Sequence, residues 1–395
     1  KKGKALVINA LALSKLYHIA HTLPPPQWAV QEVNKTIGDF LWNTEANSLI
    51  KLKHLCRPTW EGGLALKNFT TQATALRLHL LAHVFNKSTD DTWTTFAKYW
   101  IGTHLKTIKP DMWQHLVDNN TPQNLILKDD DPPFYTDSIT YIKKHTALFT
   151  RLDTSDKYVH PTTKDIYNAI AAVELKHTTI PGPDYWNKVA RREVLDWNNI
   201  WISSYADHNT NHTHETLWKL RHKTLATCEF IGKSLRNLHK PKDTKAPDSC
   251  RACKTQRETF LHCFSECEIP TYLWAQVKPH INRILELTEE LTPLKLILGD
   301  LSPKPNTTKR QRKLVITLIA IVVHQTWKMR CEIFHERAMI SPEQAWIRVR
   351  NQIAHLTTQH YHTAKMRNDV IAFKQKFLIK NSLGSLINDK LVLAV

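Results

Sequence analysis

The chain has 395 residues, and 42% of them are hydrophobic, a fraction typical of a folded protein. Because a single hydrophobic core rarely grows to this length, we expect two or three domains. Only 9 glycines occur beside 13 tryptophans and many helix-forming residues, which argues against a mainly β architecture. The composition therefore predicts a mainly α fold.

Positive charge is spread along the whole chain. Lys and Arg outnumber Asp and Glu by 54 to 36, which gives a net charge of +18. Polyanions are the natural partners of such a surface. The longest apolar run, Leu314 to Val323, is too short to cross a bilayer. We therefore expect a buried helix there and no membrane partner.

Apolar residues recur at helical spacing over most of the chain. Prolines at 24–26 end the first helix, Asn68 caps a later one, and Ser341-Pro342 starts the last. Residues 51–56 are expected to be extended or irregular, and residues 61–63 to form a turn. Helical segments are predicted over residues 5–23, 28–42, 69–84, 93–100, 135–148, 162–175, 186–238, 272–287, 310–336 and 342–377.

The sharpest motif is Cys250-x2-Cys253-x8-His262-x4-Cys267. Its four soft or borderline ligands suit tetrahedral zinc, and because protein ligands fill every position, the motif predicts a structural rather than a catalytic metal. Cys263 in place of His262 gives an equally tetrahedral all-thiolate site, and the spacing alone does not choose between them. Clustered cysteines also favour metal binding in a reducing compartment, nuclear or cytoplasmic, over a disulfide framework.

Basic residues surround this motif. A small loop that is held by a metal ion and carries cations is suited to contact backbone phosphates. It would therefore bind nucleic acid without sequence preference. The cations before and within the motif are Arg236, Lys240, Lys242, Lys245, Arg251, Lys254 and Arg257. The acidic run Asp129 to Asp131 precedes a double proline and is expected to be a solvated loop.

The stretch from Glu258 to Cys267, ETFLHCFSEC, resembles the second half of the zinc-binding domain that follows the polymerase in LINE-type (non-LTR) retrotransposon reverse transcriptases. That family's pattern uses the histidine, which favours His262 as the ligand. Residues 216–227, TLWKLRHKTLAT, resemble the Trp-containing helix just before the same motif, and residues 272–274 resemble the hydrophobic close after it.

The start of the chain is similar to the thumb of these polymerases, and the segments that carry the similarity are residues 3–16, 23–26, 40–42 and 61–66. Residues 327–334 look like a helix often found beyond the zinc domain, with Cys331 in place of the usual asparagine. The resemblance implies a thumb-like helical domain at 1–87, a helical linker at 88–185, the zinc-binding domain at 186–287 and a helical C-terminal region at 288–395.

The resemblance also implies a function, the binding of element RNA or target DNA, with Lys4 and Lys15 of the thumb-like segment contacting the backbone. The polymerase carboxylates of this family lie upstream of the thumb, so we expect no catalytic residue and no enzymatic activity in this chain on its own. Residues 205–208, YADH, imitate the polymerase signature but lack its second aspartate. The alternative is a domesticated or decayed element product that acts as a structural or protein-interaction scaffold.

Overall fold

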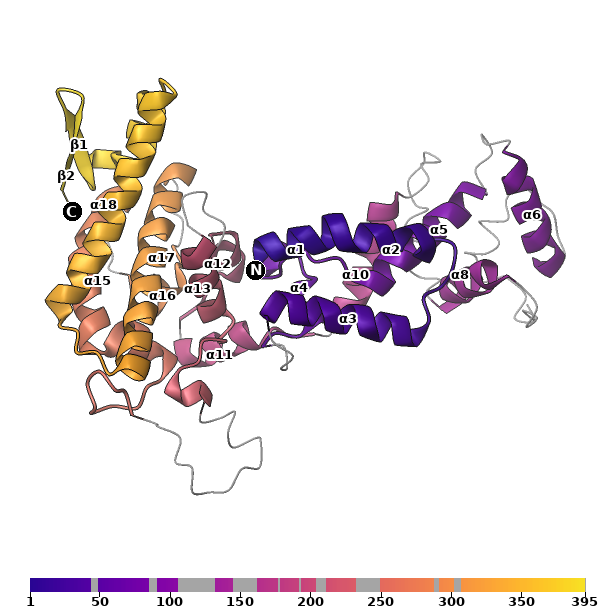
Figure 1. The fold of residues 1–395 in the computed structure, drawn as a ribbon, viewed down its shortest axis with the longest axis horizontal. Coiled ribbons are helices and arrows are strands. Elements are labelled where there is room, and N and C mark those ends of the chain that lie inside the picture. Colours follow the sequence, from indigo (N-terminus) through magenta and orange to yellow (C-terminus); the bar gives the residue numbers. More distant parts are fainter. Residues whose placement is uncertain are drawn as a thin grey trace. The chain divides into compact units, whose positions relative to one another are not determined.

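The computed structural model describes residues 1–43, 49–84, 91–105, 132–144, 162–176, 178–191, 193–203, 211–231, 249–287, 291–301 and 307–394. Over these residues the fold is mainly α, as predicted, with one β-hairpin near the C-terminal end (Figure 1). The chain forms two compact units, the first made of Lys1–Pro58 and Gly63–Thr179 and the second of Thr59–Gly62 and Ile180–Val395. The finer division at residues 88, 186 and 288 stays a prediction.

Unit 1 is a set of helices packed around the apolar helix α5. The side chain of Asn68 caps this helix, because its Oδ1 accepts a hydrogen bond of 3.1 Å from the Thr71 amide, as the sequence predicts. Leu78, Leu81 and Ile166 are fully buried where α10 packs on α5. The helices are α1 (Lys2–Val7), the π turn η1 (Ile8–Ala12), α2 (Leu13–Ala20), α3 (Gln27–Trp42), α4 (Leu52–Leu55), α5 (Phe69–Val84), α6 (Thr92–Leu105), α8 (Pro133–Lys144) and α10 (Thr163–Leu175).

The prediction for residues 51–56 is wrong, because a single helical turn, α4, lies there. Leu52 and Leu55 are three residues apart and so lie on one face of the turn. Leu55 is 1% exposed, so the turn buries an apolar side chain in unit 1. A segment of four residues is too short to show a helical repeat of apolar residues in the sequence.

Unit 2 contains the motif segment and a bundle in which α15, α17 and α18 pack side by side (Figure 1). Its elements are η2 (Thr59–Glu61), α11 (Pro181–Ala190), α12 (Trp197–Ser203), α13 (Asn211–Arg221), the π turn η3 (His262–Glu266), α15 (Glu268–Leu285), α16 (Pro293–Leu298), α17 (Lys309–Cys331), the π turn η4 (Glu332–Glu336), α18 (Pro342–Met366), α19 (Val370–Phe377), η5 (Ile379–Asn381), β1 (Gly384–Ile387) and β2 (Lys390–Leu393).

Helix α17 forms the centre of this bundle. Every residue of the apolar run 314–323 is buried, as the sequence predicts. Among the described residues, Lys309–Glu336 is the helical segment long and apolar enough to cross a membrane, and 72% of its apolar window is buried inside the protein. This burial is that of a core helix.

One sequence prediction in unit 2 needs correction. The expected single helix over 342–377 breaks after Met366, because Asn368 has a left-handed φ of 53° and the chain restarts as α19 at Val370. The cap at Ser341 is confirmed, since its side chain accepts from the Gln344 amide. The described part of 186–238 is largely helical, as the sequence predicts, in α11, α12, α13 and residues 228–231.

The antiparallel hairpin of β1 and β2, with Gly384 opposite Leu393, was not predicted.

Candidate metal centre

A tight turn positions the first two cysteines. The Cys250 amide donates to the Gln256 carbonyl at 2.8 Å, and the Lys254 amide donates to the Cys250 carbonyl at 2.8 Å. Lys254 adopts a left-handed φ of 60°, which reverses the chain directly after Cys253. An isolated bridge between Ser249 and Arg257 closes the base of this loop. The loop therefore brings the thiols of Cys250 and Cys253 to one side.

A π turn positions the other two members of the motif. In η3 the Cys267 amide donates to the His262 carbonyl at 2.9 Å, so the two residues are separated by one wide turn. Cys267 then serves as the N-cap of α15, so the start of this helix fixes its position. Single π turns occur frequently at functional sites.

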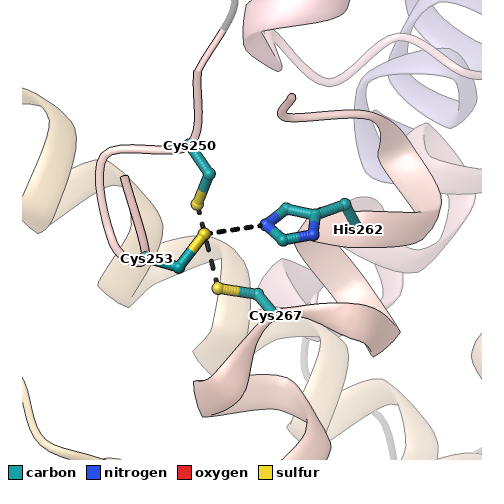
Figure 2. A group of neighbouring side chains, drawn as sticks. All are labelled: Cys250, Cys253, His262 and Cys267. Carbon is teal, nitrogen blue, oxygen red and sulfur yellow. Dashed lines mark hydrogen bonds between the residues drawn. The ribbon is translucent and has the colours of Figure 1, made fainter. Parts of the chain in front are cut away.

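Figure 2 shows the four side chains pointing toward one another. The Sγ atoms of Cys250 and Cys267 are 3.8 Å apart, and the Sγ of Cys253 lies 3.4 Å from Nε2 of His262. One ligand atom from each residue lies within 4.8 Å of all the others. Cys250, His262 and Cys267 are buried and Cys253 is half-buried. The group could hold a metal ion.

Cys263 takes no part in this group. Its side chain is 5% exposed and packs in the hydrophobic core of unit 2, and burial raises the pKa of its thiol well above the usual value. The structure thus brings together the set that contains His262, the set to which the resemblance points, and leaves the all-thiolate alternative outside.

The thiols of Cys250 and Cys267 are coupled through their contact. The hydrogen bond from Cys267 lowers the pKa of Cys250 to about 4, and the same bond raises the pKa of Cys267. A soft or borderline cation bound between the two sulfurs would stabilise both of them as thiolates.

His262 presents Nε2 to the cysteines, while its buried Nδ1 has no hydrogen-bond partner among the described residues. Ligating histidines usually donate their other ring nitrogen to an acceptor. Here His262 is only 2% exposed, so the surrounding side chains restrict its ring. The backbone amide of His262 donates to Oγ1 of Thr259 at 3.0 Å, which fixes the backbone at this position.

A buried ion pair joins the motif segment to helix α17. Arg330, near the end of α17, donates through Nη2 to Oε1 of Glu258 at 2.8 Å, and the Cys228 amide donates to the same oxygen at 2.8 Å. The guanidinium of Arg330 also lies 4.2 Å from the ring centroid of Phe334. Sequence reasoning did not single out this pair, although a charged residue inside an apolar helix was a signal for a buried partner.

The predicted phosphate-binding cations have different surroundings. Lys254 and Arg257 are exposed on the loop. Arg251 is also exposed, but its guanidinium lies 4.1 Å from the centroid of the Phe334 ring and donates to the Phe334 carbonyl at 2.6 Å. The loop is thereby anchored on η4, directly after α17. Four further predicted contacts lie outside the described residues, namely Arg236, Lys240, Lys242 and Lys245.

In unit 1, Lys4 donates to the Phe40 carbonyl and to Oδ1 of Asn43, so it links α1 to the end of α3. Lys15 is exposed on α2. The YADH segment at 205–208 and the acidic run at 129–131 lie outside the described residues.

No family model matches the chain, and no curated protein matches its sequence.

Proposed function

We propose that this chain is the nucleic-acid-binding C-terminal part of a LINE-type retrotransposon reverse transcriptase, with a structural zinc ion held by Cys250, Cys253, His262 and Cys267. The observation that carries the proposal is the convergence of these four side chains within 4.8 Å on a loop whose surface residues include Lys254 and Arg257. The resemblance of the surrounding sequence supplies the biological setting.

The geometry of the group supports zinc. Zn–S bonds of about 2.3 Å and a Zn–N bond of about 2.0–2.1 Å at tetrahedral angles require about 3.8 Å between two sulfurs and about 3.6 Å between sulfur and nitrogen. Two of the observed separations are close to these values, 3.8 Å for Cys250 to Cys267 and 3.4 Å for Cys253 to His262, and all the ligand atoms lie within 4.8 Å of one another. Because four protein ligands complete the coordination, the zinc would stabilise the loop and leave no position for a substrate.

The surface beside the centre supports contact with a polyanion. A groove of about 850 Å³ runs between the loop and the segment that leads into α18, and Arg251, Lys254 and Arg337 contribute to its lining. Glu268 is an acidic residue in the same lining, so three cations and one carboxylate line the groove. Binding of this kind involves backbone phosphates and depends strongly on salt.

The polymerase reaction itself is not assigned to this chain. In the family that the sequence resembles, the metal-binding carboxylates of phosphoryl transfer belong to the palm, before the thumb. We propose that the chain grips element RNA or target DNA and is not an enzyme on its own.

The test combines metal analysis with a salt titration of binding to labelled single-stranded RNA and DNA. The purified chain should contain about one zinc per molecule. The double variant Lys254→Gln with Arg257→Gln should reduce the magnitude of the slope of log association constant against log salt concentration by about 1.4. Each lost phosphate contact on a single strand contributes about 0.7. The matched control, Lys164→Gln with Lys188→Gln, removes the same charge from the exposed surfaces of α10 and α11.

Absence of binding to both probes at low salt would contradict the proposal and favour a scaffold. A slope equally reduced in the control pair would show that net charge, not the loop, determines binding.

A further inference from the structure

Unit 2 carries a second basic surface, at the start of α17 and along α19. Lys309 and Arg310 open α17, and Lys374 and Lys376 lie in the last turns of α19. All four side chains are exposed. The stretches 309–313, KRQRK, and 370–380, VIAFKQKFLIK, contain no acidic residue. Two segments that are far apart in sequence thus form one cationic surface, which we call the α17/α19 surface.

Packing fixes this juxtaposition. Arg310 donates through Nη1 to Oε1 of Gln375, the residue between the two lysines of α19. Gln311 donates to the Ile284 carbonyl at 2.8 Å, which ties the start of α17 to the end of α15. The cations are therefore held on a folded scaffold instead of a free tail.

The orientation of α19 follows from its aromatic residues. Phe373 and Phe377 are 3% and 2% exposed and pack into the core of unit 2. Lys374 and Lys376 must then lie on the outer side of the helix. Because the large apolar side chains face the protein, α19 offers little for insertion into a lipid surface, and its one strongly exposed apolar side chain is Ile371.

The carboxylates of the elements that pack here do little to neutralise the surface. Glu286, after α15, pairs with Lys380, so Lys380 is left out of the surface. Asp369 precedes α19 as its N-cap. Among the described residues of these helices and of η4, the remaining acids lie at the other ends of the helices, and they are Glu268 of α15, Glu332 and Glu336 after α17 and Glu343 of α18.

We propose that Lys309, Arg310, Lys374 and Lys376 form a second binding surface for the phosphodiester backbone of nucleic acid, separate from the metal-centred loop. Arg310 has five N–H donors and uses Nη1 for Gln375, so its guanidinium can still contact a phosphate through other donors. This proposal shares its class of ligand with the proposed function but uses different residues.

The two basic surfaces lie at opposite ends of α17. The loop is anchored by Phe334 and Arg330 at the C-terminal end, and Arg310 lies at the N-terminal end. Twenty residues of α-helix at a rise of 1.5 Å separate Arg310 from Arg330 by roughly 30 Å. A strand that touches both surfaces must span this distance, so only longer probes should gain affinity from both.

The experiment uses the full chain and labelled oligouridine of two lengths, one shorter and one longer than this span, over a salt series. With the longer probe, Lys374→Gln with Lys376→Gln should reduce the magnitude of the salt slope by about 1.4, and Lys309→Gln alone by about half as much. The reduction should be smaller with the shorter probe, which can bind the metal-centred loop alone. The control is again Lys164→Gln with Lys188→Gln. Far-UV circular dichroism checks that the variants fold.

A slope equal to that of the control pair would overturn the α17/α19 surface. Binding to phosphatidylserine vesicles but to neither probe would also overturn it, because the ligand would then be a membrane. The outcome is separable from that of the metal-centred loop, since the effect of the α19 pair should persist in Cys250→Ser. If the loop substitutions have no effect while the α19 pair lowers the slope, only the loop's role is lost.

Discussion

Arg330 and Glu258 form an ion pair that joins the end of α17 to the segment carrying the metal-binding residues. Their side chains are 10% and 2% exposed, and both Nε and Nη2 of Arg330 donate to Oε1 of Glu258, at 3.1 and 2.8 Å. In such a buried pair each charge depends on its partner, because water does not compensate a charge that is left alone. The pair therefore fixes where the motif segment sits on the bundle.

Substitution of Arg330 by Met should lower the free energy of unfolding by about 3–5 kcal/mol, because Glu258 would remain buried without its counter-charge. Urea unfolding followed by circular dichroism measures this. The control is Arg348→Met, which breaks the pair with Glu332, where the side chains are 40% and 20% exposed. Such a partly solvated pair contributes about 0–1 kcal/mol. Equal losses in the two variants would contradict the role given to the buried pair.

The identity of the fourth ligand is tested by neighbouring residues. His262→Asn should abolish tight metal binding, because it removes Nε2 from the group. Cys263→Ala should keep the metal, although it should cost some stability through the cavity left in the core. Mass spectrometric metal analysis after dialysis distinguishes the two. Loss of metal in Cys263→Ala with retention in His262→Asn would select the all-thiolate set.

Removal of the metal should destabilise unit 2. At a free zinc concentration about 100-fold above Kd, a bound ion stabilises the folded state by about 2.7 kcal/mol. A chelator should therefore lower the Tm of the wild-type chain and leave that of Cys250→Ser unchanged. The control Cys331→Ser alters a half-buried thiol outside the group and should respond as the wild type does. A wild-type Tm that ignores the chelator would mean that no metal stabilises the loop.

Local features of the fold were predictable from sequence. The caps at Asn68 and Ser341 depend on side chains within three residues of their acceptors or donors, and the buried run 314–323 depends on composition alone. The metal group was also predictable, because the spacing of Cys250 to Cys267 is a local property. A mainly α fold follows from the same kind of information.

Features that depend on distant contacts were not predictable. Glu258 and Arg330 are 72 residues apart, so only the packed bundle shows that they meet. The break after Met366 depends on a left-handed Asn368, whereas the apolar spacing continues through it into α19. The hairpin of β1 and β2 is held partly by Tyr361 of α18, whose hydroxyl donates to the Asp389 carbonyl. Its strands are too short to give a clear alternating pattern.

Two glycines should respond oppositely to alanine. Gly299 ends α16 with a φ of +69°, and a Cβ there would lie 2.7 Å from Cδ1 of Ile316 and 2.8 Å from Nη2 of Arg221. Gly299→Ala should therefore destabilise the chain by more than about 1 kcal/mol. Gly38 lies inside α3, where a Cβ would meet no neighbouring side chain within 4 Å, and Gly38→Ala should stabilise by about 0.5–1 kcal/mol. Thermal unfolding of both variants measures the sign of each change in stability. A Gly299→Ala variant as stable as the wild type would show that the neighbouring side chains move to accommodate the Cβ.

The stability of unit 2 should fall as the solution is acidified from about pH 7 to about pH 5, around the ordinary histidine pKa of about 6.5. Burial lowers the pKa of His324, with further contributions from His212 and Lys328. Its Nδ1 lies 2.8 Å from Oγ1 of Thr216, in the packing between α13 and α17. The folded state resists protonation of this ring.

The sign follows from proton uptake. Above the unfolded pKa both states are neutral and the full stability is present. As the pH falls below that value, the unfolded state binds a proton that the folded state does not, so stability is lost until the pH passes the lowered folded pKa. One such proton changes the free energy of unfolding by at most about 1.4 kcal/mol per pH unit. Burial lowers the pKa of His360 too, which adds a second proton with the same sign.

His324→Gln should reduce this pH dependence, because the substituted side chain does not titrate. The control His362→Gln removes an exposed histidine on α18 and should leave the slope as in the wild type. Urea unfolding at several pH values gives the free energies. If His324→Gln keeps the full wild-type slope, the loss of stability in acid must come from other groups, and the buried ring does not control it.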